Sequence, residues 1–124
     1  AYEAQELAQQ AMQAGGCAVV ARAYDDRDAN SLRTLANRLI AEPHTVALLG
    51  SSQSGKVTVV FARGEQAPLH AGNLLRVALQ KFGGGGGGRP DFAQGGGIAP
   101  GDLPSLIAYA AKQAGAELAG TGTS

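Results

Sequence analysis

The sequence of 124 residues has little cysteine, few aromatic residues and no excess of charge of either sign. Its single cysteine, Cys17, excludes an internal disulfide. No apolar run approaches the roughly 18 residues of a membrane-spanning helix and no signal-like segment opens the chain, so we expect a cytoplasmic protein without membrane contact. Ten basic residues balance ten acidic ones, which argues against a general nucleic-acid binder held by bulk electrostatics.

The sequence also lacks the patterns of a catalytic or metal-binding site. The two histidines, His44 and His70, lie far apart, and no Cys-x-x-Cys or His-x-x-x-His spacing is present. The three aspartates within residues 25–28 are explained by a turn and by the start of the helix that follows. No nucleophile with an adjacent base can be identified. We therefore expect no metal, no other cofactor and no catalysis by this chain in isolation.

One stretch, Gly50 to Lys56, comes close to a phosphate-binding P-loop, since it reads GSSQSGK. The mechanism of that motif needs a serine or threonine next, for magnesium, and a helix whose N-terminus faces the phosphates. Val57 follows instead, and it opens an apolar segment typical of a strand. We therefore interpret the stretch as a polar hairpin turn and expect no nucleotide site.

Apolar periodicity predicts an α/β domain. Strands are expected at residues 17–24, 44–49 and 56–62, and helices at residues 2–14, after a cap at Asp28 or Asn30, at residues 70–82, and after a cap at Asp102. The strand–helix–strand order implies a parallel crossover, and the short polar link before Lys56 implies an antiparallel hairpin. The sequence thus predicts a small three-stranded mixed sheet covered by helices.

The chain start at Ala1, without methionine, suggests a piece of a longer protein. We expect residues 1–16 to be the end of a helical arm, residues 17–119 to be the domain and residues 120–124 to be a flexible tail. On the helix after Asp28, Arg33 lies off the apolar stripe, and we expect its side chain in solvent.

Glycine, by contrast, is abundant and concentrated in Gly83–Gly97, where nine of fifteen residues are glycine. Ordering a backbone residue costs roughly 1–2 kcal/mol, and glycine has the most conformational freedom to lose. The stretch joins the last two predicted helices of one domain, with Gly83 at the C′ position of the first, so we expect an ordered loop rather than a tether between domains.

This loop is the strongest candidate for function. Successive glycines let backbone N–H groups converge into an anion-binding nest, and Arg89 could pair with a phosphate. Gln94 adds a neutral donor and acceptor, while Phe92 offers an aromatic face that we expect to be buried against the sheet. The alternative is a packing loop in which glycines allow a close backbone approach.

The run Gly83–Gly97, preceded by His70-Ala71-Gly72-Asn73-Leu74-Leu75, resembles the DHH-associated domain at the C-terminus of alanyl-tRNA synthetases, called C-Ala. The resemblance covers about residues 17–119. DHH phosphoesterases and RecJ-like exonucleases typically carry histidine after the triple glycine, whereas this chain has Arg89, which favours the synthetase branch. Gly85 stands where relatives often have lysine or arginine, which removes one plausible phosphate contact.

The resemblance implies a non-catalytic tRNA-binding module that contacts the outer corner of tRNA and supports aminoacylation and editing. It implies as partners tRNA(Ala), the catalytic and editing domains of the same polypeptide, and a second copy, since some members dimerise through the helical segment. Two alternatives are an accessory domain that holds a nucleotide or oligonucleotide for a DHH phosphoesterase and a pure dimerisation module. The expected RNA contacts are Arg89, Gln94, Gly84, Gly86, Gly87 and Gly88, followed by the outer basic residues Arg63, Arg76 and Lys81.

Overall fold

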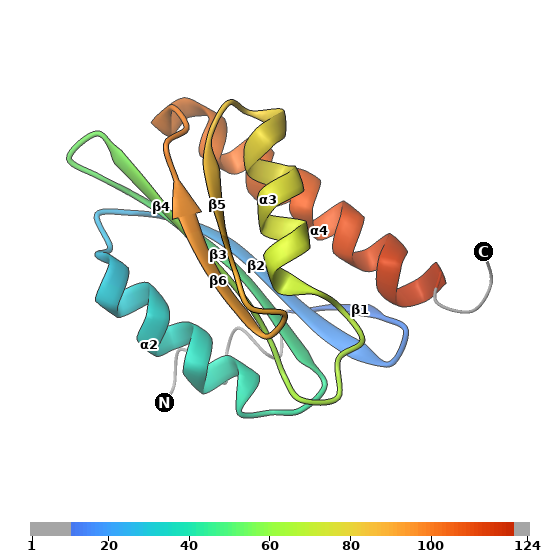
Figure 1. Cartoon of the computed structure of the whole chain (residues 1–124). Helices are drawn as coiled ribbons and strands as arrows, with labels where there is room; N and C mark the ends of the chain where they lie inside the picture. Colours follow the sequence, from blue (N-terminus) through green and yellow to red (C-terminus); the bar gives the residue numbers. More distant parts are fainter. Residues whose placement is uncertain (1–10, 121–124) are drawn as a thin grey trace.

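The protein, seen in a computed structural model that describes residues 11–120, forms one six-stranded sheet with helices on both faces (Figure 1). The strands lie in the order β1-β2-β3-β4-β6-β5. The elements in chain order are β1 (Met12–Ala14), β2 (Cys17–Asp25), α2 (Ala29–Ile40), β3 (Thr45–Gln53), β4 (Lys56–Arg63), α3 (Ala71–Lys81), β5 (Gly85–Gly88), β6 (Phe92–Gly96), the one-turn 3-10 helix η1 (Pro100–Asp102) and α4 (Leu103–Gly120).

The three predicted strands and their directions are confirmed. β2 pairs with β3 in parallel, with α2 as the crossover, and β3 pairs with β4 in an antiparallel hairpin. α2 begins where the carboxylate of Asp28 accepts a hydrogen bond from the backbone N–H of Ser31 at 2.7 Å, so Asp28 is its cap. The predicted helix at residues 70–82 is α3, and its N-cap is His70, whose Nδ1 accepts from the N–H of Asn73.

The link between β3 and β4 is shorter than predicted. The strands pair up to Gln53 and Lys56, so the turn is only Ser54-Gly55, and both turn residues have positive φ, as a tight hairpin turn requires. The polar residues of this stretch thus belong to the strand, and one of them, Ser51, is buried with its Oγ accepting a hydrogen bond from the N–H of Arg27. Lys56 opens a strand rather than a helix, as expected from the failed P-loop pattern.

The core lies in two layers, one on each face of the sheet. Alternate residues of β4 point to opposite faces, so Val59 and Phe61 pack beneath α3 and α4, while Val60 and Ala62 pack beneath α2. α2 rests mainly on β3 and β4, whereas α3 rests on β4, β5 and β6 and α4 on β2 and β3. Within residues 11–120 no helix is both long and apolar enough to cross a membrane.

The α/β class with a mixed sheet is confirmed, but the predicted number of three strands and the predicted glycine loop between the last two helices were wrong, because Gly83–Gly97 folds into the hairpin β5–β6 and extends the sheet. Glycine has poor strand propensity, so no local preference indicates these strands. These strands are stabilised by pairing within the sheet. β6 runs antiparallel to β4 from Phe92 to Gly96, and β5 pairs with β6. The prediction that Gly83 lies at C′ of the preceding helix is confirmed, since its φ is +87° and its N–H donates to the carbonyl of Gln80.

The predicted helix at residues 2–14 is also wrong at its C-terminal end, where Met12–Ala14 forms β1 and pairs with β2. The turn Gly15-Gly16 has positive φ at both residues, which matches a tight hairpin and explains why the chain reverses here. Residues 1–10 of the predicted helix and residues 121–124 of the predicted tail lie outside the described residues.

Candidate nucleic-acid interface

The β5–β6 hairpin has one side packed tightly against α3. A Cβ atom built on Gly86 would lie 2.5 Å from the Cα of Gly95 and 3.0 Å from Leu79 Cδ1. A Cβ on Gly72 of α3 would lie 2.7 Å from the carbonyl oxygen of Gly88. Contacts below 3.0 Å with backbone atoms leave no room for a side chain, so glycine is required here to bring α3 and the hairpin together.

The other side of the hairpin is open. A Cβ atom on Gly85 or on Gly87 would meet nothing within 4 Å. Gly87 pairs directly with Gln94, and Gln94 with the α2-facing Val60, so these open positions share the side of the sheet on which α2 lies. Because α2 rests mainly on β3 and β4, the hairpin extends beside the helix, and its positions Gly85 and Gly87 carry no side chains there.

Arg33 of α2 borders this open area. Its Nη1 donates to Oε1 of Gln94 at 3.0 Å, and its Nη2 donates to Oδ1 of Asn30. The expectation that Arg33 points into solvent was therefore wrong, since the side chain is half-buried and tied to the hairpin. We call the surface formed by Gly85, Gly87, Gln94 and Arg33 the open glycine face.

Arg33 was not among the predicted contacts, and no local pattern could have identified it. Helical periodicity shows only that Arg33 lies off the apolar stripe of α2, and its partner Gln94 is 61 residues away in sequence. The contact exists because β6 pairs with β4, which brings Gln94 beside α2. Only the sheet order, which the sequence pattern did not predict, places the two side chains together.

Arg89 lies at the tip of the hairpin. Its N–H donates to the carbonyl of Phe92 at 3.0 Å, which closes the turn, and its Nε lies 3.5 Å from Oδ1 of Asp91. Both side chains are well exposed, at 75% and 53%, so this ion pair contributes about 0–1 kcal/mol and can open for a ligand. The carbonyl of Pro90 accepts from the N–H of Ala71, which fixes the tip against the start of α3.

The predicted anion-binding nest is not formed. Such a nest needs successive N–H groups that converge, whereas successive N–H groups of a strand such as Gly85–Gly88 point in opposite directions. The N–H groups of Gly83 and Gly84 donate to carbonyls at the end of α3. Of the glycines predicted as contacts, Gly87 lies on the open side, while the other predicted positions, Gly84, Gly86 and Gly88, face close backbone neighbours.

The outer basic residues lie on the opposite side of the sheet. Arg76 and Lys81 are on the exposed surface of α3, where Arg76 donates to Asn73 and Lys81 Nζ lies 4.9 Å from the centre of the Tyr109 ring. Arg63 donates to the carbonyl of Gly64 and lines a hollow at the start of α3. The structure therefore divides the predicted RNA contacts into two groups, with the sheet between them.

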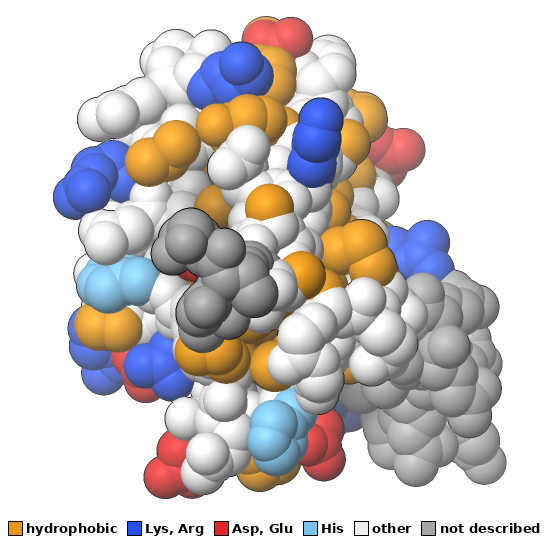
Figure 2. Space-filling view, turned by 90° about the vertical axis from the view of Figure 1, so that its right-hand side faces the viewer, with side chains coloured by type: hydrophobic (Ala, Val, Ile, Leu, Met, Phe, Trp, Pro, Cys, Tyr) orange, Lys and Arg blue, Asp and Glu red, His pale blue; other side chains and the backbone are white. Residues whose placement is uncertain are grey.

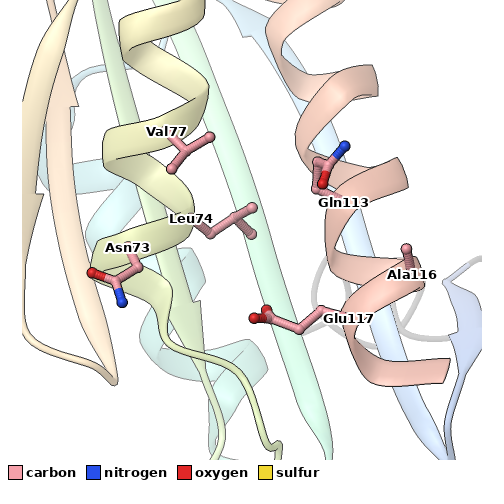
Figure 3. A pocket seen from close by; sticks show the side chains of 6 residues that line it. All are labelled: Asn73, Leu74, Val77, Gln113, Ala116 and Glu117. Carbon is pink, nitrogen blue, oxygen red and sulfur yellow. The ribbon is translucent and has the colours of Figure 1, made fainter. Parts of the chain in front are cut away.

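The surface formed by α3 and α4 is a weaker candidate for binding nucleic acid than the open glycine face. A groove of about 390 Å³ runs between the two helices and is lined by Leu74, Val77 and Ala116 together with Asn73, Gln113 and Glu117 (Figure 3). On the face that contains α4, basic side chains are spread among apolar, uncharged and acidic ones, and no large basic patch covers it (Figure 2). Across residues 11–120 no group of three or more histidine, cysteine or acidic side chains could hold a metal ion.

The sequence of this chain is similar to those of known proteins. Residues 15–116 match the DHHA1 domain. The chain is 40% identical over 106 residues to the alanine–tRNA ligase of Burkholderia multivorans, an alignment that covers 83% of this chain and 12% of that protein. The chain thus spans only a small part of the length of the curated relatives that it matches.

Two solved structures are similar to the fold. The C-Ala domain of Aquifex aeolicus alanyl-tRNA synthetase superposes with a TM-score of 0.74 at 26% identity, over 82% of this chain and 95% of that domain. RecJ from Thermus thermophilus, solved with Mn²⁺, reaches a TM-score of 0.62 at 21% identity over 91% of this chain and 16% of RecJ, which shows a shared fold. The match over residues 15–116 shows that this chain belongs to the DHHA1 domain family.

Proposed function

We propose that this chain is a non-catalytic tRNA-binding module of an alanyl-tRNA synthetase and that the open glycine face contacts the outer corner of the tRNA. The observation that carries the proposal is an open stretch of strand without side chains at Gly85 and Gly87, bordered by the donors of Arg33, Gln94 and, at the hairpin tip, Arg89. Folded RNA is recognised by its shape, by exposed bases and by ribose hydroxyls, and a surface without Cβ atoms lets such flat groups approach the backbone.

The neutral net charge fits this kind of recognition. With ten basic and ten acidic residues, the chain has no excess charge to hold a long run of phosphates. Contact with a corner of folded RNA needs few phosphates, since shape and uncharged hydrogen bonds contribute the rest. We accordingly expect a shallow dependence of tRNA affinity on salt concentration.

The family relationship supports the partners that we propose. The curated relatives are alanine–tRNA ligases, and the similar Aquifex structure is the C-Ala domain of such an enzyme. We propose tRNA(Ala) and the catalytic and editing domains of the same polypeptide as partners, in the cytoplasm, with residues 17–119 as the binding domain. Association with a second copy stays a prediction.

The role of Arg89 gives the first test. We expect Arg89→Ala to weaken binding of a tRNA(Ala) transcript in a filter assay by roughly 3- to 10-fold and to lower the salt slope by about one, because one phosphate contact is lost. Lys112→Ala, which removes the same charge from an exposed position on α4, is the matched control and should bind like the wild type. If Arg89→Ala binds tRNA as tightly as the wild type, the hairpin tip is architectural and Arg89 is not a contact.

A further inference from the structure

The bond between Arg33 and Gln94 fixes which end of the Gln94 amide faces outward. A guanidinium has five N–H donors and no acceptor, so only the oxygen of an amide can face it. In the structure Nη1 of Arg33 donates to Oε1 of Gln94 at 3.0 Å. The bond therefore uses the acceptor of Gln94 and leaves the two N–H donors of its amide nitrogen for another partner.

The neighbours of Gln94 on the adjacent strands leave those donors accessible to a ligand. Gln94 is exposed and lies between Gly87 on one neighbouring strand and the buried Val60 on the other. Val60 is apolar, and Gly87 has no side chain to compete for the amide. Nothing would lie within 4 Å of a Cβ on Gly87, so a ligand can reach the amide from that side.

Arg33 is itself held in place, so the arrangement exists before a ligand arrives. Its second terminal nitrogen, Nη2, donates to Oδ1 of Asn30 one turn earlier on α2. Asn30 and Arg33 lie in the first turns of a helix whose start is fixed by the Asp28 cap. Side chains ordered in advance lose less rotamer freedom on binding, which favours affinity and a defined direction of the hydrogen bond.

We propose that Arg33 is a positioning residue that converts Gln94 into an outward-facing donor, so that the open glycine face selects an uncharged oxygen acceptor of the RNA. The ligand group that we propose is a base carbonyl or a ribose hydroxyl, to which a neutral amide can donate. An amide can donate to a phosphate oxygen as well, and the salt slope of Gln94→Ala distinguishes that case, because only a lost phosphate contact lowers it. The inference rests on the proposed function. It assigns Arg33 an indirect role, in contrast to an arginine that contacts phosphate itself.

A double-mutant cycle tests this role. We expect Gln94→Ala to weaken binding of a tRNA(Ala) transcript by about 5-fold, which is typical of one uncharged hydrogen bond. Arg33→Ala should weaken it by about 3-fold in the wild-type background and cause no further loss in the Gln94→Ala background. The salt slope should stay unchanged in Arg33→Ala, since no phosphate contact is removed. Gln94→Glu should lose at least as much affinity as Gln94→Ala, although its carboxylate can still pair with Arg33.

Urea unfolding of each variant provides the folding control, and affinities are compared only among variants that are fully folded at the assay temperature. A transcript with 2′-deoxyriboses in the corner distinguishes the two acceptors, because the effect of Gln94→Ala vanishes on it if a ribose hydroxyl is the partner and persists if a base carbonyl is. Additive losses with a salt slope lowered by about one would overturn the inference in favour of a direct Arg33–phosphate contact.

Two further outcomes separate the inference from the function on which it rests. If the wild type binds tRNA and Gln94→Ala binds equally well, the inference is overturned and the tRNA-binding function stands. If the wild type does not bind tRNA at all, both are overturned.

Discussion

Gly86→Ala is expected to destabilise the domain by about 2–3 kcal/mol, whereas Gly87→Ala should leave its stability within about 0.5 kcal/mol of the wild type or raise it slightly. The two glycines are neighbours in the same strand, so propensity and sequence context are matched. They differ in what a methyl group would meet: backbone atoms of Gln94 and Gly95 at 2.9 and 2.5 Å in the first case, and nothing within 4 Å in the second.

The physical reason is that backbone cannot move aside as a flexible side chain can. A methyl group on Gly86 would separate β5 from β6 or lift α3, through Leu79, from the hairpin. On Gly87 the methyl group stays in solvent and only reduces the freedom of the unfolded chain. Urea unfolding followed by circular dichroism measures both, and equal midpoints for the two variants would contradict the described packing of the hairpin.

Gly87→Leu is expected to lower affinity for tRNA by at least about 10-fold while the domain remains folded. The added side chain would block contacts between the RNA and this surface, and the loss of even one well-placed contact changes affinity by that order. The side chain would cover the open glycine face beside Gln94 and keep flat groups of the RNA away from the backbone. Stability should change little, since the position opens to solvent.

The control for Gly87→Leu is Gly101→Leu, which adds the same side chain to another exposed glycine with open space around its Cβ, in η1 before α4. This variant should bind tRNA like the wild type. Filter binding at one salt concentration compares the two, and urea unfolding verifies that both are folded. Wild-type affinity of Gly87→Leu would show that RNA does not contact this face.

The sequence predicted the parts of the fold in which side-chain pattern and local chemistry carry the information. β2, α2, β3, β4 and α3 follow from apolar periodicity, and the Asp28 cap and the C′ glycine Gly83 follow from local hydrogen bonding. β5 and β6 did not follow, because the glycines of β5 have no pattern to read. Strand β6 depends on pairing with β4, which is a long-range interaction, and β5 depends in turn on pairing with β6.

The candidate site could be predicted only in part for the same reason. Arg89 and Gln94 stood out within the glycine-rich segment, and the structure places both on the hairpin. Arg33 was missed because its contact with Gln94 depends on sheet order. Arg76 and Lys81 were predicted as RNA contacts because they are basic, yet helix α3 holds both on the other side of the sheet from Gln94.

Crowding and open space alternate along the glycines of β5. Gly86 faces close backbone neighbours, which is the packing role, and Gly87 faces open space, which is compatible with contact. A strand gives this division directly, since successive residues point to opposite faces. An irregular loop would give no such alternation.

The most direct measurement compares wild-type affinity for three nucleic acids at one salt concentration: an intact tRNA(Ala) transcript, a minihelix that keeps the acceptor stem but lacks the corner, and duplex DNA. We predict that the intact transcript binds at least about 10-fold more tightly than either of the others, because only it presents the folded corner. Equal affinity for all three would contradict the claim that the open glycine face recognises folded tRNA.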